Sequence, residues 1–210
     1  MKFEAIKLEQ PLFYNNPYGL RFEIGPEELD IWVDFDRGVL NHQYLKIAVA
    51  RSIAIFETVF APNDPIAIAY QTHSDGRSRI RQGNYLFKQI TELDARSLKF
   101  SKHREIYTDD LAGPRECWRR VVISSIAVQD VNYRHILQAL VNMDFSRRRQ
   151  PAIGGQCYFI NHTNGLVLNL YDDRGMDVVA PQRQPLETLY QRHNAWILDR
   201  NREDIDKVFA

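Results

Sequence analysis

Apolar and polar residues alternate along the first part of the chain, a pattern typical of β-strands with one buried face. Two such runs lie on either side of Gly25 and Pro26, which mark a turn between them. The apolar positions of the first run are Leu20, Phe22 and Ile24, and those of the second are Leu29, Ile31, Val33 and Phe35. The pattern predicts two half-buried strands near the start of the chain.

The middle of the chain changes to helical spacing and then returns to strand-like runs. Residues 41–60 repeat apolar side chains every three to four positions and end before Pro62, so they predict a helix at the centre of the fold. Residues 65–71 and 117–128 predict strands, and the second is apolar on both faces at its centre. A short helix is expected from Asn84, and a longer one follows Asp130, whose side chain can cap it.

The C-terminal part predicts three consecutive strands at residues 156–161, 166–171 and 176–180. Asn164 and Gly165 form the first turn, and residues 172–175 form the second, because Asn and Gly tolerate the positive φ of tight turns. Pro185 can start a last helix whose apolar positions extend to Ile197. We therefore predict an α+β fold: a mixed, largely antiparallel sheet with flanking helices, and a C-terminal three-strand meander followed by a helix.

Composition supports one folded unit. With 210 residues, 44% apolar and 26% charged, the chain can bury a sizeable core, so we expect a single domain over residues 1–210. The polar, arginine-rich segment 146–155 is the place where a subdomain break is expected if the chain divides. Cys117 and Cys157 fall in strand-like runs, which favours buried free thiols over a disulfide.

Charge and hydropathy limit the partners and the location of the protein. Lys plus Arg equals Asp plus Glu at 27 each, so no global field attracts nucleic acid or an anionic membrane. The first residues carry charges rather than an apolar signal sequence, and no run reaches about 18 apolar residues. We expect a soluble, cytoplasmic protein without a membrane partner.

Three aspartates near the second meander turn are the densest acidic cluster. Asp172, Asp173 and Asp177 provide hard oxygen ligands of the kind that Mg²⁺ or Ca²⁺ prefers. The alternative, which we favour, is a β-turn in which aspartate oxygens accept backbone N–H groups, Gly175 has a positive φ and Arg174 points outward. No metal site and no cofactor are therefore predicted.

Two further residues are candidates on weaker grounds. His193 lies on the apolar stripe of the last helix, where burial could tune a base, although a hydrogen-bonded core histidine fits the same pattern. Arg119 shares a strand side with Cys117 and could lower the pKa of that thiol, but the rest of a nucleophile's environment is not visible. Zinc-ligand spacings, the nucleophile elbow, phosphate loops and dinucleotide fingerprints are all absent from the sequence.

Basic residues gather in two places, at Arg77, Arg79 and Arg81 and in the run Arg147 to Arg149. Such patches can bind phosphate backbones, but acidic residues along the chain can oppose them, so nucleic acid is not the expected partner. Another protein is the favoured partner. Homodimerisation through the three-strand segment or the last helix is an alternative.

Several segments resemble one bacterial family over nearly the whole chain. They are residues 13–25, the strand start at residues 117–119, the segment Tyr171 to Asp177, and residues 189–190 followed by residues 196–198. In these segments the chain is similar to the proteins grouped as domain of unknown function 3885. The resemblance implies a stand-alone bacterial domain of about this size, and it implies no catalytic residue, cofactor or substrate.

Two hypotheses about function follow. The favoured one is a non-catalytic protein-binding module that recognises a partner, such as a toxin domain that it neutralises. The alternative is an enzyme whose site combines Asp172, Asp173 and Asp177 with a histidine or arginine from another loop, with or without a metal ion. An enclosed cleft that joins those carboxylates would favour the enzyme.

Overall fold

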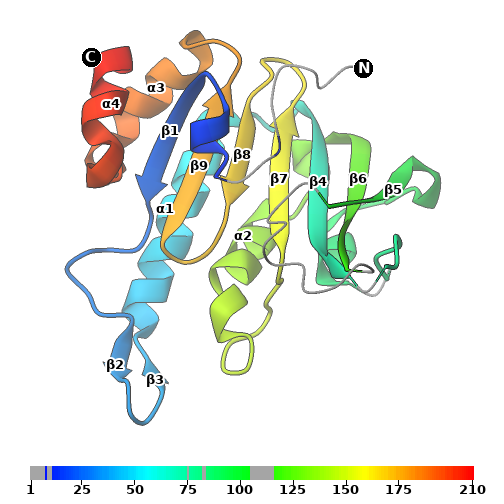
Figure 1. Cartoon of the computed structure of the whole chain (residues 1–210), viewed down its shortest axis with the longest axis horizontal. Helices are drawn as coiled ribbons and strands as arrows, with labels where there is room; N and C mark the ends of the chain where they lie inside the picture. Colours follow the sequence, from blue (N-terminus) through cyan, green and yellow to red (C-terminus); the bar gives the residue numbers. More distant parts are fainter. Residues whose placement is uncertain (1–7, 9–10, 75, 82–83, 105–115) are drawn as a thin grey trace.

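The computed structural model describes residues 8, 11–74, 76–81, 84–104 and 116–210 of the chain. Seven strands form one antiparallel sheet in the order β1-β9-β8-β7-β4-β6-β5, and a separate pair, β2 and β3, forms a small hairpin (Figure 1). The strands are β1 (Tyr18–Glu23), β2 (Trp32–Asp34), β3 (Val39–Leu40), β4 (Pro65–Ser74), β5 (Leu98–His103), β6 (Cys117–Ala127), β7 (Gln156–Asn161), β8 (Val167–Leu170) and β9 (Gly175–Ala180). The helices are α1 (His42–Val59), α2 (Tyr133–Val141), α3 (Gln184–His193) and α4 (Asp199–Phe209).

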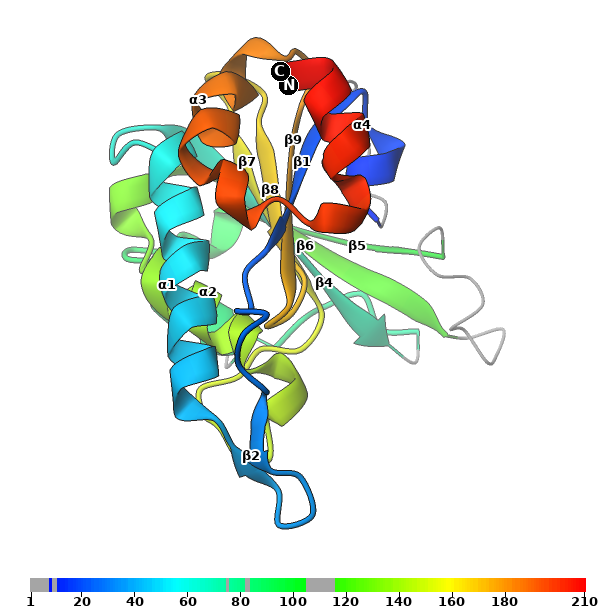
Figure 2. The same cartoon turned by 90° about the vertical axis from the view of Figure 1, so that its left-hand side faces the viewer.

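The predicted α+β class is confirmed. Every described strand pair is antiparallel, so the parallel pairing that the prediction allowed does not occur among them. Strands from both sides of segment 146–155 belong to the same sheet. Helices α1, α2 and α3 cover one face of the sheet (Figure 2), and α4 contacts the edge strand β1.

The central helix forms where the period of apolar residues predicts it. The Asn41 side chain caps α1 by accepting hydrogen bonds from the backbone N–H groups of Gln43 and Tyr44. Phe56 in this helix is fully buried and stacks on Phe60 and Tyr133. Because α1 contacts both α2 and α3, it holds the helical layer together.

The C-terminal meander matches its prediction strand by strand, with one correction at its second turn. Gly165 has a φ of +71°, as a tight turn after Asn164 requires. Gly175 does not have the positive φ that we predicted, because it already belongs to strand β9. Glycine is required there because a Cβ would overlap the Tyr171 hydroxyl.

The second N-terminal run differs most from its prediction. Only residues 32–34 form a strand, and that strand pairs with β3 outside the main sheet. Leu29 and Ile31 of the predicted half-buried face pack against the core, but Val33 is 70% exposed and Phe35 is 75% exposed, so the second half of that face is not covered. Alternation predicts a strand but cannot say whether another element covers its apolar side.

Three smaller predictions can also be compared with the structure. The prediction that Asp130 caps the helix after β6 is wrong. That helix begins at Tyr133 with Asn132 at the N-cap position, and Asp130 accepts a hydrogen bond from the backbone N–H of Ala127. Helix α4 was not predicted. Both cysteines are free and buried, as expected. No helix within the described ranges has the length and apolar character needed to cross a membrane.

Candidate functional site

Asp172 uses its carboxylate within its own turn. Its Oδ1 accepts a hydrogen bond from the backbone N–H of Arg174 at 2.8 Å, and its Oδ2 accepts one from the guanidinium Nε of the same residue at 2.9 Å. The Arg174 side chain is 73% exposed, so it lies outward as predicted while it pairs with Asp172. This carboxylate therefore shapes a turn.

Asp173 turns toward the helical layer and is 2% exposed. The Tyr44 hydroxyl of α1 lies nearby and favours its charged form, and its Oδ2 has no hydrogen-bond partner among the described residues. Burial, together with the neighbouring Asp172 carboxylate, raises the pKa of Asp173 to about 6.

Asp177 lies in β9 on the opposite side of the sheet from Met176 and Val178, which face the helices. It accepts a hydrogen bond from the backbone N–H of Phe13 at 3.1 Å and lies 3.3 Å from the Nε of Arg21. Burial raises the pKa of Asp177 to about 6, although Arg21 opposes the shift.

The three predicted aspartates therefore point to three different places. Among the residues that the structure describes, no group of three or more His, Cys, Asp and Glu side chains is arranged to hold a metal ion. Asp173 lies beside Tyr44 on the helical side of the sheet and Asp177 lies on the other side, so these two carboxylates do not face a common space.

His193 and Arg119 lie in separate parts of the molecule. The Nε2 of His193 is 2.9 Å from the Oγ1 of Thr58, and its ring stacks on Trp196 with centroids 4.7 Å apart. Burial lowers the pKa of His193. Arg119, on β6, donates a hydrogen bond from Nη1 to the backbone oxygen of Arg79 at 3.2 Å.

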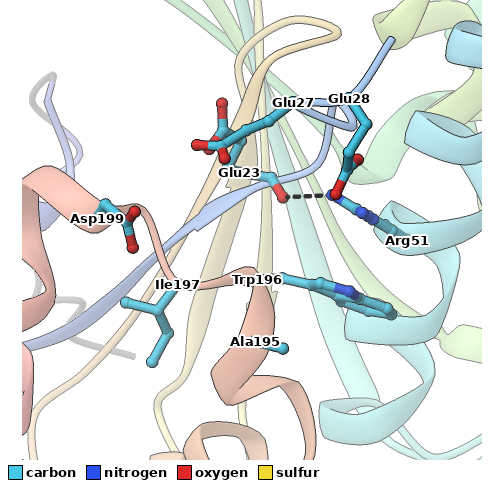
Figure 3. Close-up of a pocket in the computed structure, with 8 residues that line it drawn as sticks. All are labelled: Glu23, Glu27, Glu28, Arg51, Ala195, Trp196, Ile197 and Asp199. Atoms are coloured by element: carbon cyan, nitrogen blue, oxygen red, sulfur yellow. Dashed lines mark hydrogen bonds between the residues drawn. The ribbon is translucent and has the colours of Figure 1, made fainter.

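A different set of residues lines a polar cleft of about 130 Å³ between β1, α1 and the start of α4 (Figure 3). We call it the acidic cleft. Its lining residues are Glu23, Glu27, Glu28, Arg51, Ala195, Trp196, Ile197 and Asp199. The lining holds four carboxylates and one guanidinium, so its formal charge is minus three.

Arg51 is the basic residue among those that line the acidic cleft. It donates hydrogen bonds from Nη1 to the backbone oxygens of Glu23 at 3.4 Å and Gly25 at 3.2 Å (Figure 3). Its guanidinium carbon also lies 5.4 Å from the centroid of the Trp196 ring, a cation–π distance. The arginine therefore binds mainly to backbone oxygens and to an aromatic face.

The three glutamates of the cleft are not neutralised by ion pairs. Burial raises the pKa of Glu23, and a hydrogen bond with Glu27 adds to the shift, while Arg51 opposes it. None of the three glutamates forms an ion pair within the described part of the chain, whereas Asp199 pairs with Arg202 at 3.1 Å. A cation that entered the cleft would find carboxylates that are not yet neutralised.

The fold brings the two sides of the cleft together through backbone pairing. Phe22 of β1 forms an isolated bridge with Ile197, and the backbone N–H of Leu198 donates a hydrogen bond to the backbone oxygen of Arg21. These contacts bring residues 195–199 against the glutamates that follow β1. Sequence reasoning missed this site because its parts are separated by more than 140 positions, and the only local signal was the group of acids at residues 23–30.

Comparisons with known proteins give a family and no activity. A family profile described as "Domain of unknown function (DUF3885)" matches residues 2–201. A protein of Bacillus subtilis (strain 168), named "Uncharacterized protein YnaE", is 29% identical over an alignment that covers 93% of each chain. No solved structure matches the chain.

Proposed function

The chain belongs to the family Domain of unknown function (DUF3885), a description that assigns no activity, and from its surface we propose that it is a non-catalytic protein-binding module. In this proposal the acidic cleft receives a lysine or arginine side chain from a partner protein. A toxin domain with a basic surface is one such partner, since binding alone would be enough to neutralise it.

The observation that carries the proposal is the internal arginine of the cleft. Arg51 already lies against Trp196 and the main-chain oxygens of Glu23 and Gly25, so this wall suits a guanidinium. After Arg51 and the Arg202 guanidinium that pairs with Asp199 are both counted, a formal charge of minus two remains. A second cation is therefore favoured over an anion or a neutral group.

The strength of this contact sets what kind of binding to expect. Ion pairs that stay in contact with solvent contribute roughly 0.2 to 1 kcal/mol each. One basic side chain in the cleft would therefore bind weakly by itself, and a partner must add contacts around the rim. The cleft is proposed to give orientation and specificity within a larger interface.

The proposal predicts that a triarginine peptide binds the wild-type chain more tightly than the Glu27→Gln, Glu28→Gln variant. Loss of two carboxylates should weaken binding by about fivefold to tenfold, which corresponds to about 1 kcal/mol. Isothermal titration calorimetry at low ionic strength measures the difference. Lowering the pH should also weaken binding to the wild type, because Glu23, with its raised pKa, takes up a proton earlier than an ordinary glutamate.

A matched control separates the cleft from general attraction to acidic surfaces. The Glu92→Gln, Glu187→Gln variant removes the same charge at two residues that do not line the cleft. It should bind the peptide as the wild type does. Equal affinity in all three proteins would contradict the proposal.

A further inference from the structure

The small hairpin carries a concentration of exposed apolar side chains. It extends from Asp30 to Leu40 and projects beyond the lower end of α1, away from α3 and α4 (Figures 1 and 2). Val33, Phe35 and Val39 are 70%, 75% and 45% exposed. Among the described residues, only Tyr14 is another large apolar side chain with such exposure. Exposed apolar groups gathered on a projection are typical of an interaction surface.

The hairpin is fixed to a neighbouring loop, which we call the arginine loop, residues 144–149. The Trp32 ring packs edge to face on Phe145 of this loop, with centroids 5.8 Å apart, and makes the same kind of contact with Phe35. The guanidinium carbon of Arg148 lies 5.4 Å from the centroid of the Trp32 ring. The two segments therefore present one continuous surface in a defined orientation.

The two halves of this surface carry opposite charge. The hairpin holds three aspartates and one arginine, and the arginine loop holds one aspartate and three arginines. Their net charges are thus minus two and plus two. No ion pair among the described residues joins the hairpin to the arginine loop. Arg37 pairs with Asp34 within the hairpin, at 3.5 Å. The charged residues are Asp30, Asp34, Asp36 and Arg37 in the hairpin, and Asp144, Arg147, Arg148 and Arg149 in the loop.

From this pattern we propose that the hairpin and arginine loop form a homodimer interface with a second copy of the chain. In an isologous contact each surface meets its own copy, so a two-fold axis can place each acidic hairpin opposite the partner's basic loop. The exposed Val33, Phe35 and Val39 of the two copies then cover one another. A purely basic or acidic partner would match only half of this surface, whereas a second copy matches both halves.

The size of the surface sets the strength of the dimer. Standard interfaces use about 20 to 30 residues on each side, and the two segments together contain fewer. The dimer should therefore be weak, with a dissociation constant on the order of 100 µM, and it should weaken as salt screens the charged pairs. This interface is separate from the acidic cleft, so the proposed function does not depend on it.

Sedimentation velocity of the purified full-length chain, from about 5 to about 500 µM, tests the proposal. We expect the wild type to shift from monomer to dimer over this range. The Val33→Asp, Phe35→Asp variant should remain monomeric, because it replaces the apolar contact across the two-fold axis with like charges, and side chains at least 70% exposed can be changed without loss of the core. The Gln191→Asp variant, on exposed α3 at the other end of the molecule, should dimerise like the wild type. A wild type that stays monomeric at every concentration would overturn the proposal.

Charge reversal tests the arrangement more sharply. The Asp30→Lys, Asp36→Lys variant gives the hairpin a net charge of plus two, like that of the arginine loop, and the Arg147→Glu, Arg149→Glu variant gives the loop a net charge of minus two, like that of the hairpin. Each variant should be monomeric alone, and an equimolar mixture should form a heterodimer at least as stable as the wild-type dimer. A mixture that shows no association would contradict the charge complementarity on which the interface depends.

Discussion

The free energy of unfolding of the wild-type chain should fall as pH rises from 4 to 7, relative to the Asp177→Asn variant. Asp177 is 1% exposed, and its pKa is raised to about 6. The upward shift of about two pKa units corresponds to roughly 3 kcal/mol between the protonated and ionised forms. Urea unfolding at a series of pH values measures the effect in both proteins.

The sign follows from linkage between protonation and folding. A carboxyl whose folded pKa is raised binds its proton more tightly in the folded state than in the unfolded chain. Its stabilising contribution is complete below the unfolded pKa near 4 and is lost as pH rises through 6. Asp173, with its pKa also raised to about 6, should show the same direction in an Asp173→Asn variant.

An exposed carboxylate gives the control for this experiment. The Glu92→Gln variant removes one negative charge from the surface, and its pH profile can be compared with that of Asp177→Asn. Wild-type and Asp177→Asn curves that run parallel from pH 4 to 7 would show that Asp177 ionises in the fold as it does in the unfolded chain. The description of a desolvated carboxylate would then be wrong.

Substitution of Gly25 by alanine should destabilise the fold by about 2 to 4 kcal/mol. A Cβ at this position would overlap the hydroxyl of Tyr44, a buried residue that lies near the Asp173 carboxylate. Moving the tyrosine away would also leave the buried Asp173 carboxylate without the neighbouring hydroxyl that favours its charged form. Chemical denaturation at neutral pH measures the loss.

Another glycine provides the comparison for Gly25. No heavy atom outside its immediate chain neighbours lies within 4 Å of a Cβ built on Gly154, so Gly154→Ala should change stability by less than about 0.5 kcal/mol. Equal effects of Gly25→Ala and Gly154→Ala would mean that Tyr44 does not restrain the backbone beside the acidic cleft.

The sequence predicted the parts of the fold that are specified locally. The meander has turn residues between its apolar runs, and α1 has a capping Asn41 and a helical apolar period. The boundaries of these elements can therefore be predicted from the local sequence. Helix α4 was missed because it is mostly charged and buries only Asn201, Ile205 and Phe209. Its stability comes from packing against β1, which a local pattern does not show.

The site could be predicted far less well. The aspartates near the second meander turn were candidates for a shared site because they are close in sequence. Strand alternation instead places Asp177 on the face of the sheet opposite the helices. The acidic cleft depends instead on the pairing of Phe22 with Ile197, which brings distant residues together. His193, predicted from its helix stripe, reaches the cleft only through its stacking on Trp196.

The most direct test of the binding-module account is an NMR titration of the wild-type chain with N-acetyl-arginine amide. We predict that the indole N–H signal of Trp196 and the Nε–H signal of Arg51 shift most, because these two groups form the wall that a guanidinium would share. The same signals should shift much less in the Glu27→Gln, Glu28→Gln variant. Shifts that are absent, or that spread evenly over acidic residues outside the cleft, would contradict the account.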